Sequence, residues 1–327
     1  MDWTKIKRTR ASSGKPYGPY VNLDDLIRLQ FQVADFSLQP QQPVTSILAG
    51  RYASRLRGRG LNFEELRQYQ SGDDIRTMDW KVTARTKIPH VRVYTEEKDR
   101  QVLLLVDQRI NMFFGTRDKF KSVTAAEIAA IASWRAIDSG DRIGALVFND
   151  NEIVSVRPHR SNQAVMSILG QIIHFNQQLH VGADTESNNG MLNTALENAL
   201  RMALKDVLVV LISDCQGADQ QTEKHITRLA AHNDVICFLV HDPTRLALAP
   251  RRLALSDGKR QIEVDLGDKK IRERLLVDYE QETANLTRFF RKLSAPFLLV
   301  NNKGNTSEQV RRLLGVPLAG GNGGLVK

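Results

Sequence analysis

Short apolar runs alternate with longer amphipathic segments through the middle of the chain. The runs have the length and composition of strands that are buried on both faces, and they cover 101–107, 143–148, 207–213 and 235–240. The longer segments space their apolar residues along one face of a helix, over 119–139, 161–178, 192–204 and 220–231. This alternation predicts an α/β fold with a doubly wound, mostly parallel sheet that carries helices on both faces.

The part of the chain before this region predicts smaller elements. Residues 1–20 are basic and rich in Gly, Pro and Ser, and we expect a flexible arm there. A helical stripe runs over 23–36, so 21–49 are interpreted as an N-terminal helix and a linker. Residues 50–98 predict a small β-rich extension, because they contain short alternating stretches at 63–69, 78–84 and 91–94.

The main domain is expected to cover 99–300, because further elements follow the alternating region. These are a strand, a long charged helix and a last short strand, at 261–266, 269–293 and 297–300. Residues 301–327 are interpreted as a terminal helix, over 307–314, and a Gly-rich tail.

The chain is basic, with 46 Lys and Arg against 37 Asp and Glu, which gives a formal net charge of +9. Such a surplus favours acidic partners, among them nucleic acids, anionic membrane surfaces and acidic proteins. The basic run Arg51, Arg55, Arg57 and Arg59 is interpreted as a solvated face, or else as a site for phosphate or an acidic partner. Aromatic residues that stack on bases are sparse beside this run, so nucleic-acid binding is kept only as an alternative.

The sequence also bears on the cellular compartment. No run approaches the ~20 consecutive apolar residues that span a bilayer, so no transmembrane segment is expected. No apolar stretch follows the basic N-terminus, which argues against a signal peptide. The two cysteines, Cys215 and Cys237, do not form a CxxC motif or a disulfide framework. A reducing, cytoplasmic location is therefore expected.

The linear motifs of common enzymes are missing from the chain. It contains no GxxxxGK[ST], no HExxH and no GxSxG sequence. Gly58-Arg59-Gly60 begins a dinucleotide-binding pattern, but Phe63 stands where the pattern needs a glycine. The seven histidines are scattered and do not pair at zinc-ligand spacing. We therefore expect a protein that is not an enzyme, with a hydrolase built from distant residues as a rival.

Two of the predicted strands end in acids, Asp107 and Asp214. Open parallel sheets bind ligands beyond the carboxyl ends of their strands, at the point where the strand order reverses. If the two strands are neighbours, their carboxylates at about 4 Å repel by roughly 4 kcal/mol at an effective dielectric constant near 20. A cation, a proton or a basic side chain must offset this repulsion.

These residues carry a resemblance to known families. A strand that ends in Asp107, and a later strand that ends in Ser213-Asp214 before Gly217, resemble the von Willebrand factor A domain. The domain-of-unknown-function 58 family is similar over about 45–240, through motifs at 57–60, 65–69, 72–76, 79–81, 83–85 and 141–144. Its members are typically encoded beside MoxR-type AAA+ ATPases. The resemblance implies an adaptor that works with such an ATPase on an unknown client protein.

The resemblance implies a metal site from which this sequence departs. Von Willebrand factor A domains hold Mg²⁺ with Asp-x-Ser-x-Ser, a Thr and a further Asp, and only Asp107 and Asp214 match that set. Arg109 and Asn111 replace the two serines, and Met191 stands where the Thr is expected. Since Mg²⁺ needs six hard oxygen ligands, we expect no cofactor. If Mg²⁺ did bind, its protein ligands would be Asp107, Asn111 and Asp214.

We interpret Asp107, Arg109, Asn111, Met191 and Asp214 as a degenerate adhesion site that binds a partner. The hypothesis is that the Arg109 guanidinium replaces the ion between Asp107 and Asp214, as a permanent cation with bidentate geometry. The alternative is that Arg109 points to solvent and the site has no function.

A second candidate site lies in the extension. It alternates acids and bases around a tryptophan, and its residues are Gly72, Asp73, Asp74, Arg76, Asp79, Trp80, Lys81 and Arg85. One interpretation is a clamp of ion pairs and Trp80 packing that joins the extension to the sheet domain. The other is a docking surface for the ATPase.

The expected function is protein–protein interaction, as an adaptor or co-chaperone of a MoxR-type AAA+ ATPase in protein maturation or complex assembly. The first alternative is a Mg²⁺-dependent adhesion-type binding protein. The second alternative is a basic nucleic-acid-binding protein.

Overall fold

The chain divides into two compact units. The computed structural model describes residues 18–32, 61–70, 73–96, 100–116, 118–180, 187–243, 252–256, 261–265 and 268–314. Unit 1 comprises residues 1–44 and 101–327, and unit 2 comprises residues 45–100. Unit 2 therefore encloses the extension predicted at 50–98.

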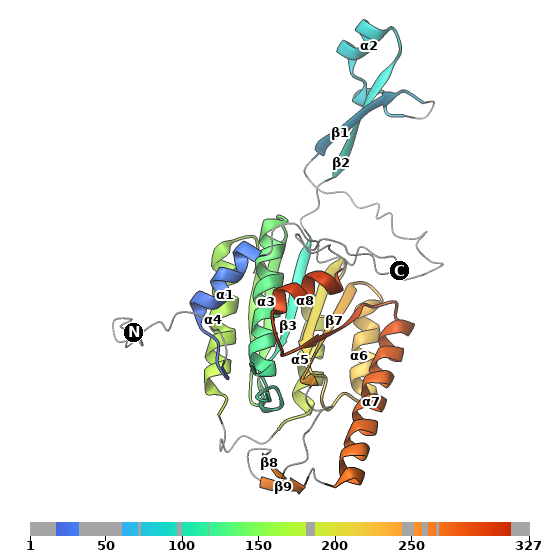
Figure 1. Ribbon diagram of the computed structural model, residues 1–327. Helices are drawn as coiled ribbons and strands as arrows, with labels where there is room; N and C mark the ends of the chain where they lie inside the picture. The colour runs from blue at the N-terminus through green and yellow to red at the C-terminus, as the bar shows by residue number, and fades with distance from the viewer. Residues whose placement is uncertain are drawn as a thin grey trace, which may run out of the picture. The chain divides into compact units, whose positions relative to one another are not determined.

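A six-stranded sheet forms the centre of unit 1 (Figure 1). Its order is β10-β7-β6-β3-β4-β5, and each neighbouring pair is parallel except β4 and β5. The strands are β3 (Gln101–Asp107), β4 (Arg142–Phe148), β5 (Ile153–His159), β6 (Val207–Ser213), β7 (Asp234–His241) and β10 (Phe297–Asn301). The chain moves from β3 outward to β5 and then returns to the other side of β3, so the strand order reverses between β3 and β6.

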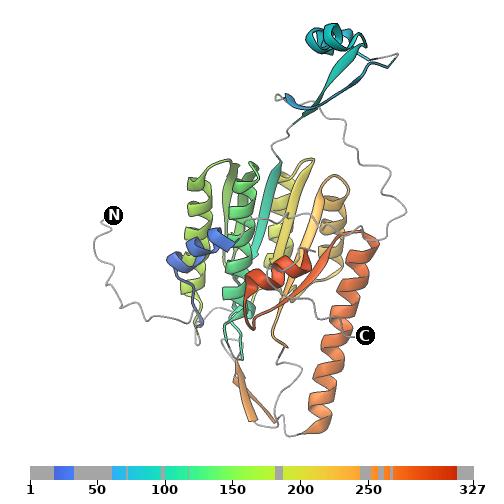
Figure 2. The same cartoon turned by 45° about the horizontal axis from the view of Figure 1, so that its top comes forward.

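Helices cover both faces of this sheet, as Figure 2 shows from a second angle. The helices are α1 (Leu23–Arg28), α3 (Lys121–Asp138), α4 (Asn162–Gln178), α5 (Gly190–Met202), α6 (Gln220–Ala230), α7 (Lys269–Lys292) and α8 (Thr306–Leu313). Apolar residues of α1, α3, α4 and α8 pack in one core cluster, and those of α5, α6 and α7 pack in a second. The predicted α/β class, with a mostly parallel sheet between two helical layers, is confirmed.

The alternation of side chains along β3 explains the two cores. Val102, Leu104 and Val106 belong to the first cluster, and Leu103 and Leu105 belong to the second. Successive residues of a strand point to opposite faces, so a central strand between two helical layers must be apolar at every position. This requirement is the reason that β3 reads as one continuous apolar run.

Strand β5 was not predicted. It pairs antiparallel with β4 at the edge of the sheet, and its residues are half-buried or exposed along its whole length. It also contains Pro158, which cannot donate a hydrogen bond and is tolerated at a sheet edge. A short, half-polar strand with a proline lacks the apolar run that identified its neighbours.

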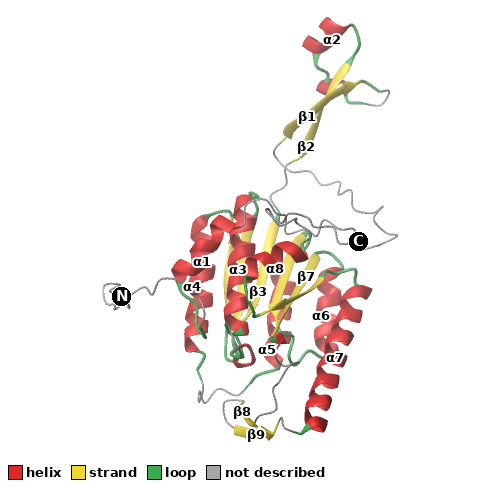
Figure 3. Cartoon of the chain, in the orientation of Figure 1, coloured by secondary structure: helices red, strands yellow, loops and turns green. Residues whose placement is uncertain are grey.

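Unit 2 contains a hairpin with a helical insertion (Figure 3). Strands β1 (Leu61–Gln68) and β2 (His90–Glu96) pair antiparallel, and the 3-10 helix η3 (Ile75–Thr77) and helix α2 (Trp80–Thr86) lie between them in the chain. The prediction of a strand at 78–84 is wrong. Asp79 begins a helix there, because its carboxylate accepts hydrogen bonds from the backbone N–H groups of Lys81 and Val82, at 3.0 and 3.1 Å.

The remaining elements are a 3-10 helix after α1 and a pair of strands between β7 and α7. Helix α1 continues as the 3-10 helix η2 (Leu29–Gln32), and the rest of the helix predicted at 23–36 lies outside the described residues. Strands β8 (Arg252–Ser256) and β9 (Gln261–Asp265) form a separate antiparallel pair. The basic arm up to residue 17, the basic run at 51–59 and the tail from 315 also lie outside the described residues.

Two further observations concern the helices and the cysteines. None of the helices in the described ranges combines the length and the apolar composition that crossing a bilayer requires. Cys215 and Cys237 are both free and buried, and their Sγ atoms lie 3.9 Å apart.

The packing of α7 on the sheet rests on its aromatic residues. Phe290 is fully buried, and its ring stacks on that of Phe297 at 5.0 Å between centroids. We expect Phe290→Ala to lower the free energy of unfolding by about 3–5 kcal/mol, because the substitution leaves a cavity in the second core. Val277 lies on the same helix and is 57% exposed, so Val277→Ala should change stability by less than about 0.5 kcal/mol. Urea unfolding of both variants checks this, and equal losses would contradict the packing described.

Candidate functional site

Each parallel strand in the middle of the sheet ends beside a buried acid. Asp107 ends β3, Asp150 follows β4, Asp214 follows β6 and Asp242 follows β7. The exposed fraction is 0% for Asp107, 4% for Asp150 and 2% for Asp242, and it is 8% for the side chain of Asp214. Because β3, β4, β6 and β7 are parallel, all four acids lie along the same carboxyl edge. Asp107 and Asp214 flank the reversal of strand order, which is where open α/β sheets bind ligands.

The Asp107 carboxylate is bound by Arg109 from the loop that follows β3. Arg109 donates from Nε to Oδ1 and Oδ2, at 3.0 and 3.1 Å, and from Nη2 to Oδ2 at 2.7 Å. Its backbone N–H donates to Oδ1 at 3.0 Å, and the Ser213 hydroxyl donates to Oδ2 at 2.6 Å. Both partners of this ion pair are 0% exposed. Asp107 is thus a saturated acceptor rather than an available base.

The Asp214 carboxylate is bound by Lys121 from the first turn of α3. Lys121 Nζ donates to Oδ2 at 2.5 Å, and the backbone N–H of Gln216 donates to Oδ1 at 3.0 Å. Arg109 Nη2 lies 3.9 Å from Oδ1. Burial disfavours the charged carboxylate, but Lys121 and then Arg109 outweigh it and lower the pKa of Asp214. Asp214 is therefore held as an anion.

Arg109 lies between the two acids, where the sequence hypothesis placed it. The side chain is fully buried, and its guanidinium carbon lies 5.8 Å from the centre of the Phe148 ring. Nη2 also donates to the carbonyl of Gln216 at 3.2 Å, whereas Nη1 has no hydrogen-bond partner among the described residues. Burial alone would lower the pKa of Arg109. The neighbouring carboxylates, above all Asp107, outweigh burial and raise this pKa above its usual value, so the cation is permanent. The alternative of a solvent-facing Arg109 is wrong.

Asp150 fixes two loops of the same edge. It accepts hydrogen bonds from the backbone N–H of Ile110 at 2.6 Å and from that of Asn188 at 2.8 Å. Burial raises the pKa of this carboxyl, and the two backbone N–H groups and Arg109 oppose the rise. Asp150 therefore ties the loop after β3 to the loop before α5.

A polar network at Asp242 connects the carboxyl edge to the C-terminal elements. Asp242 accepts from the backbone N–H and hydroxyl of Thr116, at 2.7 and 2.9 Å, and from the Asn302 amide at 3.0 Å. Beside it, the ammonium group of Lys119 bonds Glu127 and, at 2.7 Å, the hydroxyl of Thr306. These contacts anchor β10 and α8 to the start of α3.

The other two residues of the predicted site take no part in these bonds. Asn111 lies in the 3-10 helix η4 (Ile110–Met112), and its buried amide nitrogen has no hydrogen-bond partner among the described residues. Met191 is 9% exposed and packs in the second core cluster at the start of α5. Sequence reasoning missed Lys121, Ser213 and Asp150. Of these three residues, the sequence signals only Asp150, because it follows β4 as Asp107 and Asp214 follow the apolar runs of β3 and β6.

The arrangement does not fit a magnesium ion. The Arg109 guanidinium stands between the acids that would bind the metal, and Met191 provides no oxygen ligand. Within the described ranges, His, Cys, Asp and Glu side chains do not gather in groups of three or more that suit a metal.

The second candidate site is stabilised within unit 2. Asp73 pairs with Arg67 at 2.7 Å, and Asp79 pairs with Arg92 at 2.7 Å. Trp80 is 65% exposed within unit 2. The clamp to the sheet domain and the docking surface for the ATPase both stay predictions. Asp74 accepts from the backbone N–H of Arg76 at 3.0 Å, and the side chains of Arg76, Lys81 and Arg85 are exposed. Gly72 lies outside the described residues.

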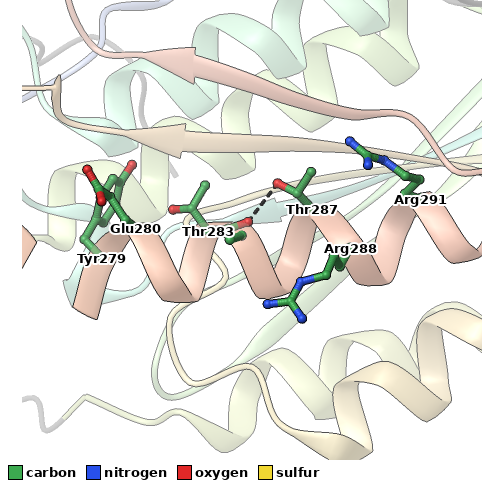
Figure 4. Close-up of a pocket in the computed structure, with 7 residues that line it drawn as sticks. Tyr279, Glu280, Thr283, Thr287, Arg288 and Arg291 are labelled. Atoms are coloured by element: carbon green, nitrogen blue, oxygen red, sulfur yellow. Dashed lines mark hydrogen bonds between the residues drawn. The ribbon is translucent and has the colours of Figure 1, made fainter. Parts of the chain in front are cut away.

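Two hollows on the described surface differ from a catalytic cleft. One of about 440 Å³ runs along α7 and is lined by Tyr279, Glu280, Thr283, Ala284, Thr287, Arg288 and Arg291 (Figure 4). Another, of about 620 Å³, is lined by seven residues of α6 and by Phe289. Binding sites for small molecules usually gather polar groups from several elements in one concave pocket. The first hollow is lined by a single helix, and seven of the eight residues that line the second belong to α6, so neither has that form.

We predict that Lys121→Met makes the stability depend on pH in a new way. In the wild type the lowered pKa of Asp214 stabilises the fold above about pH 4, and this contribution is lost as the pH falls further. In the variant Asp214 loses its nearest cation, so the fold should lose about 3–5 kcal/mol near neutral pH. Protonation of Asp214 relieves this penalty, so the difference from the wild type should shrink toward pH 4.

Urea unfolding at a series of pH values measures this difference. Lys224→Met removes an exposed lysine on α6 and serves as the control, with little expected change at any pH. A Lys121→Met protein that is as stable as the wild type near neutral pH would show that the ion pair does not hold the site.

Comparisons with known proteins place the chain among proteins that have no assigned function. It is 28% identical over 273 residues to uncharacterized proteins of Mycobacterium bovis and Mycobacterium tuberculosis, which covers 83% of this chain and 84% of each relative. A crystal structure of the conserved hypothetical protein BatB from Bacteroides thetaiotaomicron covers 65% of this chain and 98% of its own, at 13% identity and a TM-score of 0.38. That likeness is too low to carry an argument.

The family model described as "Protein of unknown function DUF58" matches residues 65–285, which is more than half of the chain. This match confirms the family that the motifs of the extension and of the β4 region predicted. The chain belongs to the DUF58 family of proteins of unknown function.

Proposed function

We propose that this protein is a non-enzymatic protein–protein interaction module with a von Willebrand factor A-like domain. Its partner is proposed to be a MoxR-type AAA+ ATPase, for which it acts as an adaptor or co-chaperone in the maturation or assembly of a client protein. The observation that carries the proposal is the internal neutralisation of the carboxyl edge. Asp107 and Asp214, the acids most suited to chemistry, are bound by Arg109 and Lys121.

A catalytic acid or base must reach the proton that it transfers. Asp107 is 0% exposed and accepts hydrogen bonds from both Arg109 and Ser213. Asp150 uses its two carboxylate oxygens for the backbone N–H groups of Ile110 and Asn188. In each case the carboxylate fixes the position of a loop. A rigid edge with ordered loops supports recognition of a partner, because little conformational entropy is lost on binding.

A Mg²⁺-dependent binding protein is the alternative, and the position of Arg109 bears on it. Arg109 Nη2 lies 2.7 Å from an oxygen of Asp107 and 3.9 Å from an oxygen of Asp214. A cation at the position of this nitrogen would interact with both acids. The covalently attached guanidinium already provides that cation, and Met191 removes a ligand position, so we favour the metal-free proposal.

Affinity capture tests the adaptor proposal. We expect the full-length tagged chain to retain a MoxR-type AAA+ ATPase from native lysate, to a different extent with and without ATP. The reason is that a partner that changes conformation with its nucleotide binds an adaptor with different affinities in its two states. A tagged basic protein of similar net charge is the control, because a charge of +9 attracts acidic proteins without specificity. Recovery of no such ATPase under either condition would contradict the proposal.

A further inference from the structure

Unit 2 exposes large apolar side chains at the end of its hairpin. Trp80, Ile75 and Ile88 are 65%, 60% and 46% exposed. They belong to the insertion that holds η3 and α2, which connects the end of β1 to the start of β2 (Figure 3). Single exposed apolar residues are common, but a group that includes a tryptophan is typical of an interaction site.

The same segment carries cations that face solvent. Arg76, Lys81, Arg85 and Lys87 are exposed, and none has an ion pair with an acid in the described ranges. The acids nearby are already engaged: Asp73 binds Arg67 and Asp79 binds Arg92. Asp74 caps η3 through the backbone N–H of Arg76. The outward charge of the segment is therefore positive.

Helix α2 presents the tryptophan and two of the cations on one side. At 100° per residue, Trp80, Lys81, Ala84 and Arg85 fall on one half of the helix, and all four are exposed. Val82 and Thr83 lie on the opposite half and are half-buried. The Thr83 hydroxyl accepts a hydrogen bond from the backbone N–H of His90 at 3.0 Å, so this half faces the hairpin.

The helix is held firmly although one side of it is uncovered. The Asp79 carboxylate caps the helix and also accepts from Arg92 Nε of β2 at 2.8 Å. The backbone N–H of Asp79 donates to the carbonyl of His90 at 2.9 Å, and Met78 forms a β-bridge with Val91. A surface that is ordered before binding loses less entropy when a partner docks.

We propose that Ile75, Arg76, Trp80, Lys81, Arg85 and Ile88 form a docking surface, the tip surface, for a protein segment that combines acidic with large apolar side chains. The inference rests on the proposed function, because it assigns the surface with which the chain contacts a protein partner. The partner's apolar side chains cover Trp80 and the isoleucines, and its carboxylates pair with Arg76, Lys81 and Arg85.

The composition of the tip surface favours protein over nucleic acid. Surfaces that bind single strands place several aromatic side chains in a row, so that successive bases stack on them. Among the described side chains of unit 2, Trp80 is the one large aromatic that is exposed. Ile75 and Ile88 gain most from burial against apolar side chains, which phosphates and sugars do not provide.

The probes for the test are labelled synthetic polymers and the full-length chain. Fluorescence anisotropy measures binding of a random copolymer of glutamate and tyrosine, with polyglutamate and a mixed-sequence single-stranded oligonucleotide as comparisons. We expect the copolymer to bind tighter than either comparison probe. Trp80→Ala and Arg85→Glu should each weaken copolymer binding by about tenfold, which is the usual effect of losing an interface anchor.

Matched variants separate this effect from folding and from net charge. Arg228→Glu makes the same charge reversal on an exposed residue of α6, and it should change copolymer affinity by less than about twofold. Ile75→Ser is a second apolar variant, in case Trp80→Ala disturbs α2. Circular dichroism and thermal unfolding of each variant should match those of the wild type.

Several results would overturn the inference. One is equal binding of polyglutamate and copolymer with no effect of Trp80→Ala, because charge alone would then explain the attraction. Another is tighter binding of the oligonucleotide that Trp80→Ala abolishes, which would assign the tip surface to nucleic acid.

Capture from lysate distinguishes this inference from the proposed function. If the wild type, Trp80→Ala and Arg85→Glu all retain the ATPase equally, the adaptor function holds and the tip surface is not its docking site. If the wild type retains no ATPase but copolymer binding depends on Trp80 and Arg85, the tip surface holds and the ATPase is not its partner.

Discussion

The buried ion pair between Arg109 and Asp107 determines what the carboxyl edge of the sheet can do. Two strands that end in acids lie side by side at the point where the strand order reverses, and their like charges require a cation. The chain provides that cation itself, because Arg109 follows two positions after Asp107 and its side chain is fully buried. Lys121 on α3 completes the compensation by pairing with Asp214. Removal of either base would leave a buried charge unpaired, which is among the most destabilising changes in a folded protein.

Charge is used in opposite ways in the two units. In unit 1 the buried acids Asp107 and Asp150 are bound by Arg109 and by backbone N–H groups, and they hold loops in place. In unit 2 the acids also serve the fold, but the bases Lys81 and Arg85 remain exposed beside Trp80. In the function proposed above, recognition belongs to outward surfaces, and the strand ends provide rigidity.

Sequence reasoning succeeded where a local pattern determines the structure. The apolar run of β3 is dictated by burial on both faces, and Arg109 reaches Asp107 because only one residue separates them. It failed where the partner comes from elsewhere in the fold. The pairing of Lys121 with Asp214 depends on how α3 packs, and no pattern in the sequence brings them together. The extension was mistaken for strands around Trp80, although Asp79 was a visible signal for the start of a helix.

Calorimetric titration of the full-length protein with Mg²⁺ and Mn²⁺ tests the central claim, that Arg109 has taken the place of a metal ion. The account predicts no saturable binding at submillimolar concentrations of either ion, because the guanidinium already binds Asp107 and lies beside Asp214. Saturable binding in that range, lost in a folded Asp107→Ala variant, would contradict it. Such a result would restore the metal-dependent interpretation of the site.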